Sequence, residues 1–501
     1  MPLPILVGIG ICTLGLTQVQ VFGSTKGKDQ MLHDTSISRD AAQHRQHVEN
    51  GLLVEPEFAT QDYQKSNLLE RMKFYNVPSA SIAVINNFKI EWAQGYGIRE
   101  AGKHEPVTDE TLFQVCSISK AVTAVAVLRL VQQGRLDLDA DVNKYLVSWK
   151  IPKNGSWQPQ VTLRQLLTHT AGLGHGVPGY ALGEPIPTLH QVLDGLPPAI
   201  TLPVRVTTLP GTQYRYSSDG YTVLQQLLID VEGKPFPQLM NDLVFAPLEM
   251  RHSTFEQPLP QKLWESAASG YRTLAPYSNP DKWQVFPEMA AGGLWTTASD
   301  LARLIVELQL SKAGKSNKLL SAAMVQQMFT KQVPDSNIGL GIYMDGEGAN
   351  ARFSHTGAQL GWNAEMLGYV EKGQGAVVLL NNGYTGTLLK PEIERAIAVE
   401  YGWPDFVPQK VVSAAVNPTV YDAYVGKYET SVGLIHVSKQ ANTLLFQLSG
   451  QSPIELYPKS ATEFYAKDVD TEITFVLPAE GKIGELNLRQ KGRTINGKKI
   501  K

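Results

Sequence analysis

The spacing of hydrophobic and polar residues changes along the chain, so that different regions show the repeat patterns of strands, helices or loops. Apolar runs at 80–85 and 88–92 lie on either side of Asn86-Asn87, a pattern that predicts a β-hairpin. Between Ser117 and Gly134 almost every position is apolar, which predicts a buried helix that ends at the glycine. A long stretch follows in which helical periodicity alternates with loops rich in proline and glycine.

Strands are expected again at 339–343, 364–370 and 375–380, and a helix over 391–401. The mixed stretch from about 135 to 330 then forms a mainly helical insertion. Strands at both ends of a region with helices between them predict an α+β fold. We expect one antiparallel sheet, built from both ends of the domain and flanked by helices.

The pattern changes once more after this helix. Prolines at 404, 408 and 418 indicate a linker over 403–418. From 419 to 501, short runs with alternating apolar positions recur roughly every ten residues and are separated by turn residues. This pattern predicts a small all-β domain, a barrel or a sandwich. The main domain is expected to span 59–402.

The N-terminus is typical of a cleavable export signal, with an apolar core at 5–16 and small residues at Val21 and Gly23. We expect residues 1–23 to be removed and the protein to be secreted or periplasmic, with 24–58 as a loose polar lead-in. No basic residue precedes the apolar core, so an uncleaved membrane anchor is the alternative. Glutamines at 18 and 20 shorten the run below the roughly 18 residues of a span, which favours cleavage and leaves no integral span.

Composition narrows the function classes. A chain of 501 residues with 43% hydrophobic and 18% charged residues is typical of a packed globular protein of about two domains. Its net charge of −2 gives no electrostatic reason to expect a nucleic acid as partner. Removal of the signal leaves Cys116 as the single cysteine, which excludes an intramolecular disulfide. We interpret Cys116 as a small buried packing residue.

Candidate chemistry begins at Ser117 and Lys120, which form the pattern S-x-x-K. Positions three apart lie on one face of a helix, with their Cβ atoms roughly 5–6 Å apart. A serine hydroxyl becomes a useful nucleophile when a nearby base takes its proton, and a lysine one turn away can help to do so. The alternative is a helix-capping serine beside a surface lysine, since this spacing also arises by chance.

Two further segments carry candidate residues. Tyr216 lies in a turn-rich stretch before an apolar helix that Ser218 or Asp219 can cap. His355-Thr356-Gly357 ends a predicted strand, where the glycine allows a ligand backbone to approach closely. The alternatives are an edge aromatic residue with a solvated hydroxyl and an ordinary hairpin with a surface histidine. His169 and His175 lack the carboxylates of a zinc site, so we expect neither a metal nor another cofactor.

In this order, the three segments resemble the signature of the serine β-lactamase and penicillin-binding-protein superfamily, which is S-x-x-K, Y-x-N or S-x-N, and K-T-G or H-T-G. Stretches at 168–173, 245–250 and 291–301 resemble further family segments of the class C β-lactamase-like branch, which includes esterases and D-amino-acid peptidases. The resemblance covers about residues 60–400. The segment 424–428 is similar to the start of the lipocalin-like C-terminal domains often fused to this family.

The resemblance implies a serine hydrolase with an acyl-enzyme intermediate, whose active site lies between the sheet and the helical insertion. It implies that Ser117 is the nucleophile and that Lys120 and Tyr216 share the proton handling. The backbone N–H groups of Ser117 and Ala358 would form the oxyanion hole. The remaining substrate-binding residues would be His355, Thr356, Gly357 and Ser218.

Two departures from the family pattern bear on the substrate, which is expected to be a small molecule or a peptide. His355 stands where β-lactamases carry a lysine, and a histidine is mostly neutral near pH 7. This favours an ester or a D-amino-acid or peptidoglycan-type amide over a β-lactam. Ser218 stands where the family has asparagine, so an acylated but slowly turning-over penicillin-binding or sensing protein is the alternative. A class C-type β-lactamase is a further alternative, and the oligomeric state is left open.

Overall fold

A computed structural model gives the structure of the protein. It describes residues 38–53, 57–58, 65–174, 176–271, 282–334, 336–406, 410–411, 413–430, 433–448, 453–466, 471–476, 484–490 and 493–500. The expected signal peptide, residues 1–23, lies outside the described residues, as does His175.

The main domain contains a six-stranded antiparallel sheet with the strand order β3-β2-β11-β10-β9-β8. Strands β2 and β11, which come from opposite ends of the domain, pair in its middle, with Ile82 opposite Val378. This arrangement confirms the predicted α+β fold. The strands are β2 (Ser79–Asn86), β3 (Lys89–Gly97), β8 (Tyr343–Asp345), β9 (Arg352–Gln359), β10 (Trp362–Tyr369) and β11 (Gly375–Leu380).

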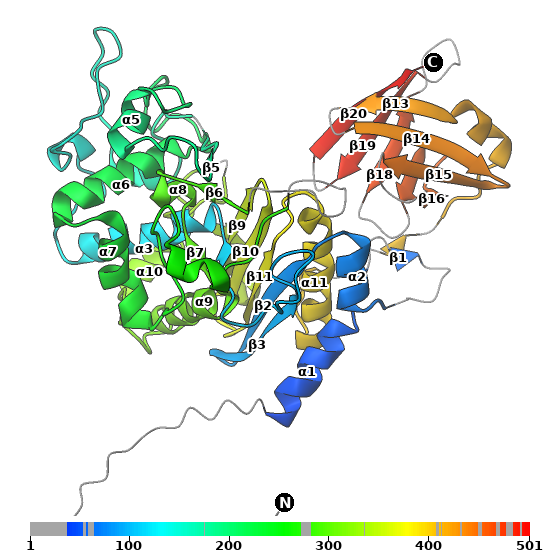
Figure 1. Cartoon of the computed structure of the whole chain (residues 1–501), viewed down its shortest axis with the longest axis horizontal. Coiled ribbons are helices and arrows are strands. Elements are labelled where there is room, and N and C mark those ends of the chain that lie inside the picture. Colours follow the sequence, from blue (N-terminus) through cyan, green and yellow to red (C-terminus); the bar gives the residue numbers. More distant parts are fainter. Residues whose placement is uncertain are drawn as a thin grey trace, which may run out of the picture. The chain divides into compact units, whose positions relative to one another are not determined.

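Helices cover both faces of this sheet (Figure 1). Successive side chains of a strand point to opposite faces. Val377 and Leu379 of β11 therefore pack on the side of helix α9 (Ala298–Lys312), in the same core cluster as Leu301. Val378 points to the opposite side, where its core cluster includes side chains of helices α2 (Leu68–Phe74) and α11 (Gly386–Tyr401). Burial of both faces explains why β11 is a continuous apolar run without alternation.

The expected loose lead-in contains a helix, α1 (Arg39–Glu49). Its N-terminus is capped by Ser38, whose hydroxyl accepts a hydrogen bond from the N–H of Ala41 at 3.2 Å. Ala41 and Val48 are its buried residues. So few apolar positions in a polar segment gave no periodic signal, which is why the sequence did not reveal this helix.

Helix α3 (Ile118–Gln132) is the buried helix expected after Ser117. Each residue from Ile118 to Leu128 is buried, and Gly134 follows the helix with φ +71°.

The other helices are α4 (Leu163–Leu167), α5 (Leu189–Asp194), α6 (Asp219–Glu232), α7 (Phe236–Met240), α8 (Met289–Gly292) and α10 (Ala322–Met328). Short helical turns are η1 (Val142–Lys144), η2 (Asn241–Phe245), η3 (Ala246–Leu248), η4 (Gln261–Ser266), η5 (Gly348–Asn350) and η6 (Pro418–Ala423). Two-residue strands form the pairs β4 (Phe113–Gln114) with β7 (Trp295–Thr296) and β5 (Tyr180–Ala181) with β6 (Gln284–Val285).

Three element boundaries differ from those predicted. The hairpin turns at Asn87 and Phe88, both with positive φ, one residue later than expected. The strand expected over 339–343 begins only at Tyr343. Gly341, which packs against Ala124, adopts φ +79° and so interrupts the extended backbone before it. Helix α11 begins five residues before the predicted start and contains Pro391 in its interior.

The C-terminal region is a closed barrel of eight antiparallel strands, as predicted for an all-β domain. Burial alternates along its strands, for example along β15, so that one set of side chains fills the interior. The strands are β13 (Gly426–Thr430), β14 (Gly433–Gln440), β15 (Thr443–Leu448), β16 (Ile454–Pro458), β17 (Glu463–Ala466), β18 (Glu472–Val476), β19 (Glu485–Gln490) and β20 (Arg493–Ile500).

The alternating runs do not predict two of these strands, β16 and β20. The expected linker contains β12 (Lys410–Val411), which pairs in parallel with β1 (Glu57–Phe58). Within the described part of the chain, none of the helices combines the length and the apolar character that crossing a membrane requires.

Candidate active site

Ser117 and Lys120 lie side by side at the start of α3. Ser117 is the residue that precedes the helix, and its side chain makes no capping hydrogen bond. The Lys120 ammonium donates to the Ser117 hydroxyl at 3.2 Å and to the carbonyl oxygen of Ala291 at 2.7 Å. Lys120 is 0% exposed, whereas Ser117 is only partly buried. This geometry excludes the alternative of a surface lysine beside a capping serine.

Cys116 gives the chain a sharp bend just before Ser117. Its φ of +51° lies in the left-handed region, which costs a residue with a side chain roughly 1–2 kcal/mol. The thiol is buried, and burial raises its pKa well above the usual range. Cys116 is therefore a packing residue, as predicted, but its strained backbone was not foreseen. Strain of this kind persists only where the surrounding structure holds it in place.

Tyr216 comes from the loop that precedes α6. Its ring lies 5.1 Å from the Lys120 ammonium, and the ring of Tyr221, in the first turn of α6, lies 5.8 Å from it. Tyr216 is 40% exposed, so it faces both the lysine and solvent. Ser218 is the buried residue before α6, but its side chain does not cap the helix. The structure thus brings Ser117, Lys120 and Tyr216 together.

Strand β9 carries the third group of candidate site residues. His355 and Gly357 are buried, and the alternate residues Thr356 and Ala358 are exposed. Any side chain at Gly357 would overlap the carbonyl oxygen of Val115. The close approach that requires glycine here is therefore made by the chain's own backbone, and not by a ligand as expected. It places the exposed end of β9 next to the bend that leads into Ser117.

His355 is held inside the domain in its neutral form. Its Nδ1 lies 2.7 Å from the carbonyl oxygen of Thr356 and must carry the proton, because a carbonyl only accepts. Burial lowers the pKa of His355 to about 4, and the positive charge of Lys120 also lowers it. Its ring packs 5.5 Å from that of Tyr343, whose hydroxyl is 2.7 Å from that of Tyr214. A surface histidine is excluded.

Glu288 is a buried carboxyl that sequence reasoning missed. It precedes α8, the short helix whose Ala291 carbonyl accepts from Lys120. Neither of its carboxylate oxygens has a hydrogen-bond partner among the described residues. Burial raises the pKa of Glu288 to about 7, and the nearby Asp219 contributes to the rise. A single glutamate within an apolar stretch was the only signal in the sequence.

His169 also lies at the site. It follows α4, and its ring packs 4.4 Å from the ring of Tyr216. The structure therefore groups it with the candidate catalytic residues. Across the described ranges, no group of three or more His, Cys, Asp or Glu side chains is arranged to hold a metal ion.

This fold is that of the serine β-lactamase and penicillin-binding-protein hydrolases. Within that class the chain belongs to the Beta-lactamase family, whose model matches residues 65–399. Members of this family are in general hydrolytic.

Two relatives are examples of the proteins whose sequences are similar to this chain. Protein flp of Staphylococcus aureus (strain MW2) is 25% identical over 317 residues, which are 63% of this chain and 62% of that protein. The match therefore spans less than two thirds of the length of flp. The putative penicillin-binding protein PbpX of Bacillus subtilis (strain 168) is 26% identical over 321 residues, which are 63% of this chain and 73% of PbpX.

Two solved structures share the fold. The octameric penicillin-binding protein homologue from Pyrococcus abyssi has a TM-score of 0.57 and 22% identity, and the match covers 86% of this chain and 98% of that one. EstCE1, a hydrolase with promiscuous acyltransferase activity, has a TM-score of 0.55 and 20% identity, with coverage of 71% and 98%.

Proposed function

We propose that the protein is a serine hydrolase that forms an acyl-enzyme on Ser117 and acts on an ester or on a D-amino-acid or peptidoglycan-type amide. The observation that carries this proposal is the contact of the buried Lys120 ammonium with the Ser117 hydroxyl at 3.2 Å. Membership of the Beta-lactamase family supports it independently.

In the proposed mechanism, the Ser117 oxygen attacks the substrate carbonyl carbon while its proton passes to the pair of Lys120 and Tyr216. The pair acts in the form that lacks one proton, either as an amine with a phenol or as an ammonium with a phenolate. These two groups act as a coupled pair, so the proton belongs to the pair during the reaction. The N–H groups of Ser117 and Ala358 stabilise the oxyanion, and the loss of one such donor typically costs about 3–4 kcal/mol. Tyr216 then protonates the leaving group and later activates the water that releases the acyl group.

The charge of the site supports this substrate class. His355 of strand β9 is neutral, because burial, together with the charge of Lys120, lowers its pKa to about 4. It therefore supplies no fixed positive charge for the carboxylate of a β-lactam at neutral pH. Esters and amides that lack this carboxylate need no such charge, and they are the proposed substrates.

A penicillin-binding or sensing protein that is acylated but scarcely turns over is the second candidate. Ser218 favours it, because its short side chain replaces the family asparagine and is buried beside the proposed site. A hydroxyl lacks the reach and the paired donor and acceptor of an amide. Slow release of the acyl group would follow if that amide normally helps to place the deacylating water.

The test compares turnover of short-chain nitrophenyl esters, nitrocefin and D-alanyl peptides by the wild type and by Ser117→Ala. We expect ester or peptide turnover that disappears in the variant, together with loss of labelling by fluorophosphonate or penicillin probes. Stoichiometric labelling without turnover would support the penicillin-binding candidate instead. Labelling that persists in folded Ser117→Ala would contradict the assignment of the nucleophile.

We also propose that the protein is exported and loses residues 1–23, so that the mature chain begins at Ser24. The apolar core at 5–16 supports this. Intact-mass analysis of the exported protein tests it, and a full-length mass of 501 residues would contradict cleavage. The domain bounds 59–402, 403–418 and 419–501 stay predictions of the same kind.

A further inference from the structure

We infer that His169 is a positioning residue for Tyr216. It holds Tyr216 in place through hydrogen bonds with the two residues on either side of the tyrosine in the chain. This inference rests on the proposed function, in which Tyr216 handles protons. No direct contact of His169 with the substrate is involved.

Two hydrogen bonds connect His169 to the loop that carries Tyr216. The N–H of Arg215 donates to the carbonyl oxygen of His169 at 2.8 Å. The N–H of Ser217 donates to Nδ1 of the His169 ring at 3.2 Å. One residue 47 positions earlier in the chain thus fixes the backbone on both sides of Tyr216, which is itself 40% exposed on a loop.

The imidazole also supports the phenol ring directly. The ring centroids of His169 and Tyr216 are 4.4 Å apart with an interplanar angle of 37°. The rings of Tyr214 and Tyr221 pack against His169 at 6.0 and 5.5 Å. Since Lys120 lies over the rings of both Tyr216 and Tyr221, a shift of the imidazole would change where the phenol lies relative to the lysine.

His169 itself is held in an unusual conformation. Its φ of +59° lies in the left-handed region, where histidine is found more often than most residues with side chains. On either side, the hydroxyls of Thr168 and Thr170 lie 3.0 Å apart, and the Thr168 hydroxyl donates to the carbonyl of Arg164 at 2.8 Å. The N–H of Thr170 donates to the carbonyl of Gln165 at 2.9 Å.

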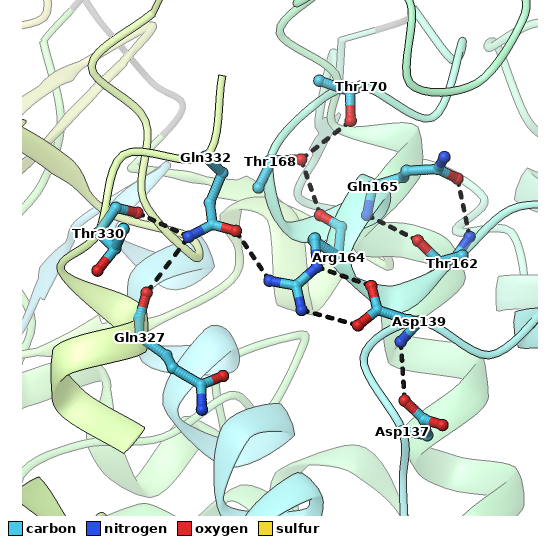
Figure 2. A network of polar contacts seen from close by, with 10 residues as sticks. All are labelled: Asp137, Asp139, Thr162, Arg164, Gln165, Thr168, Thr170, Gln327, Thr330 and Gln332. Atoms are coloured by element: carbon cyan, nitrogen blue, oxygen red, sulfur yellow. Dashed lines mark hydrogen bonds and ion pairs between the residues drawn. The ribbon is translucent and has the colours of Figure 1, made fainter. Parts of the chain in front are cut away.

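A wider network anchors this turn (Figure 2). The Arg164 guanidinium forms two hydrogen bonds with the Asp139 carboxylate, at 2.7 and 2.8 Å, and a third with Gln332 at 2.8 Å. Thr162 and Gln165 form a capping box at the start of α4. The histidine therefore projects from a rigid support, as a positioning role requires.

The hydrogen bond from Ser217 determines the form of the imidazole. Nδ1 accepts, so the neutral ring carries its proton on Nε2. Burial lowers the pKa of His169 well below its usual range, and the charge of Lys120 also lowers it, which favours this neutral acceptor form. A protonated ring would have no acceptor for the Ser217 N–H.

The experiment uses two variants that both tolerate a positive φ, His169→Asn and His169→Gly. Both remove the ring, but only asparagine retains a side-chain acceptor close to the position of Nδ1. We expect His169→Gly to lower kcat for a nitrophenyl ester by about 10–100-fold with KM changed less than threefold, since misplacement of a catalytic group by about 1 Å has effects of this size. We expect His169→Asn to recover at least fivefold of that loss.

A merely structural role gives a different result. It would lower the melting temperature of both variants while kcat per folded molecule stayed at the wild-type value. Equal kcat values for the two variants, or a wild-type kcat for His169→Gly, would overturn the inference. Parallel labelling of wild type and Ser117→Ala separates this outcome from failure of the proposed function: labelling that does not depend on Ser117 refutes the nucleophile, whatever the His169 variants do.

Discussion

Gly357 lies so close to the carbonyl oxygen of Val115 that any side chain at position 357 would overlap it. This contact fixes strand β9 against the backbone that bends at Cys116 and leads into Ser117. In the proposed mechanism, the two oxyanion donors are the N–H groups of Ser117 and Ala358, one from each of these segments. Their separation therefore depends on the contact between Gly357 and Val115.

We predict that Gly357→Ala lowers kcat for an ester substrate by about 100-fold or more, because the methyl group pushes the two donors apart. Overpacking of this kind also destabilises a core by about 1–3 kcal/mol. Steady-state kinetics and thermal unfolding measure the two effects. The matched control is Gly484→Ala, where an added Cβ meets nothing within 4 Å. A kcat equal to that of the control would show that this contact does not set the oxyanion geometry.

Glu288 provides a prediction about the pH dependence of stability. Its pKa is raised from 4.5 to about 7 in the folded state, mainly by burial. Between these pH values the folded protein binds more protons at this site than the unfolded chain does, so the free energy of unfolding falls as pH rises through the window. The full shift corresponds to about 3 kcal/mol, which is lost progressively between about pH 4.5 and pH 7.

We therefore expect Glu288→Gln to unfold like the wild type at pH 4 and to be more stable than it at pH 8, by about 1–3 kcal/mol. Denaturant unfolding at the two pH values measures the difference. Glu371→Gln, at an exposed position, is the control and should show no such trend. A stability difference that is independent of pH would mean that Glu288 does not titrate in this window.

The sequence identified the parts of the site that depend on local spacing. Ser117 and Lys120 are one helical turn apart, and the apolar run after them was enough to predict a buried helix. Their catalytic roles, with that of Tyr216, stay predictions. The pairing of strands from both ends of the domain also followed from the order of the elements, and the structure confirms it.

Long-range contacts and backbone conformation were beyond the sequence. The hydrogen bond between His169 and Ser217 joins residues 48 positions apart, and no local pattern announces it. The positive φ of Cys116 is equally invisible, because cysteine has no special preference for that region. Gly357 was expected to admit a ligand, whereas only the folded chain shows that the carbonyl of Val115 fills the space.

We expect Cys116 to resist alkylation in the folded protein. The thiol is fully buried, and burial raises its pKa, so the reactive thiolate is both scarce and inaccessible. Mass spectrometry after iodoacetamide treatment at pH 8 should find no adduct on Cys116 under native conditions and an adduct on this residue after unfolding in guanidinium. Rapid native modification would place the thiol on an accessible surface and contradict its packing role.

The identity of residue 355 gives a test of substrate selection. His355 is buried and neutral at pH 7. Its burial and the positive charge of Lys120 both lower its pKa, which is about 4. A lysine at this position would bring the permanent cation that β-lactamases of this family carry there. A second buried cation near Lys120 also destabilises the fold, so activities must be compared as ratios within each folded variant.

We predict that His355→Lys raises the ratio of nitrocefin to ester kcat/KM by about fivefold or more, because a charge-assisted hydrogen bond to the drug's carboxylate is roughly twice as strong as a neutral one. The ester lacks the carboxylate and should gain nothing. His355→Gln is the control: it removes the imidazole without adding charge, so its ratio should stay near that of the wild type. If His355→Lys and His355→Gln gave the same ratio, charge at this position would not select the substrate. The shape of the cleft would then be the filter, and the loops between about 176 and 205 would be the next segment to vary.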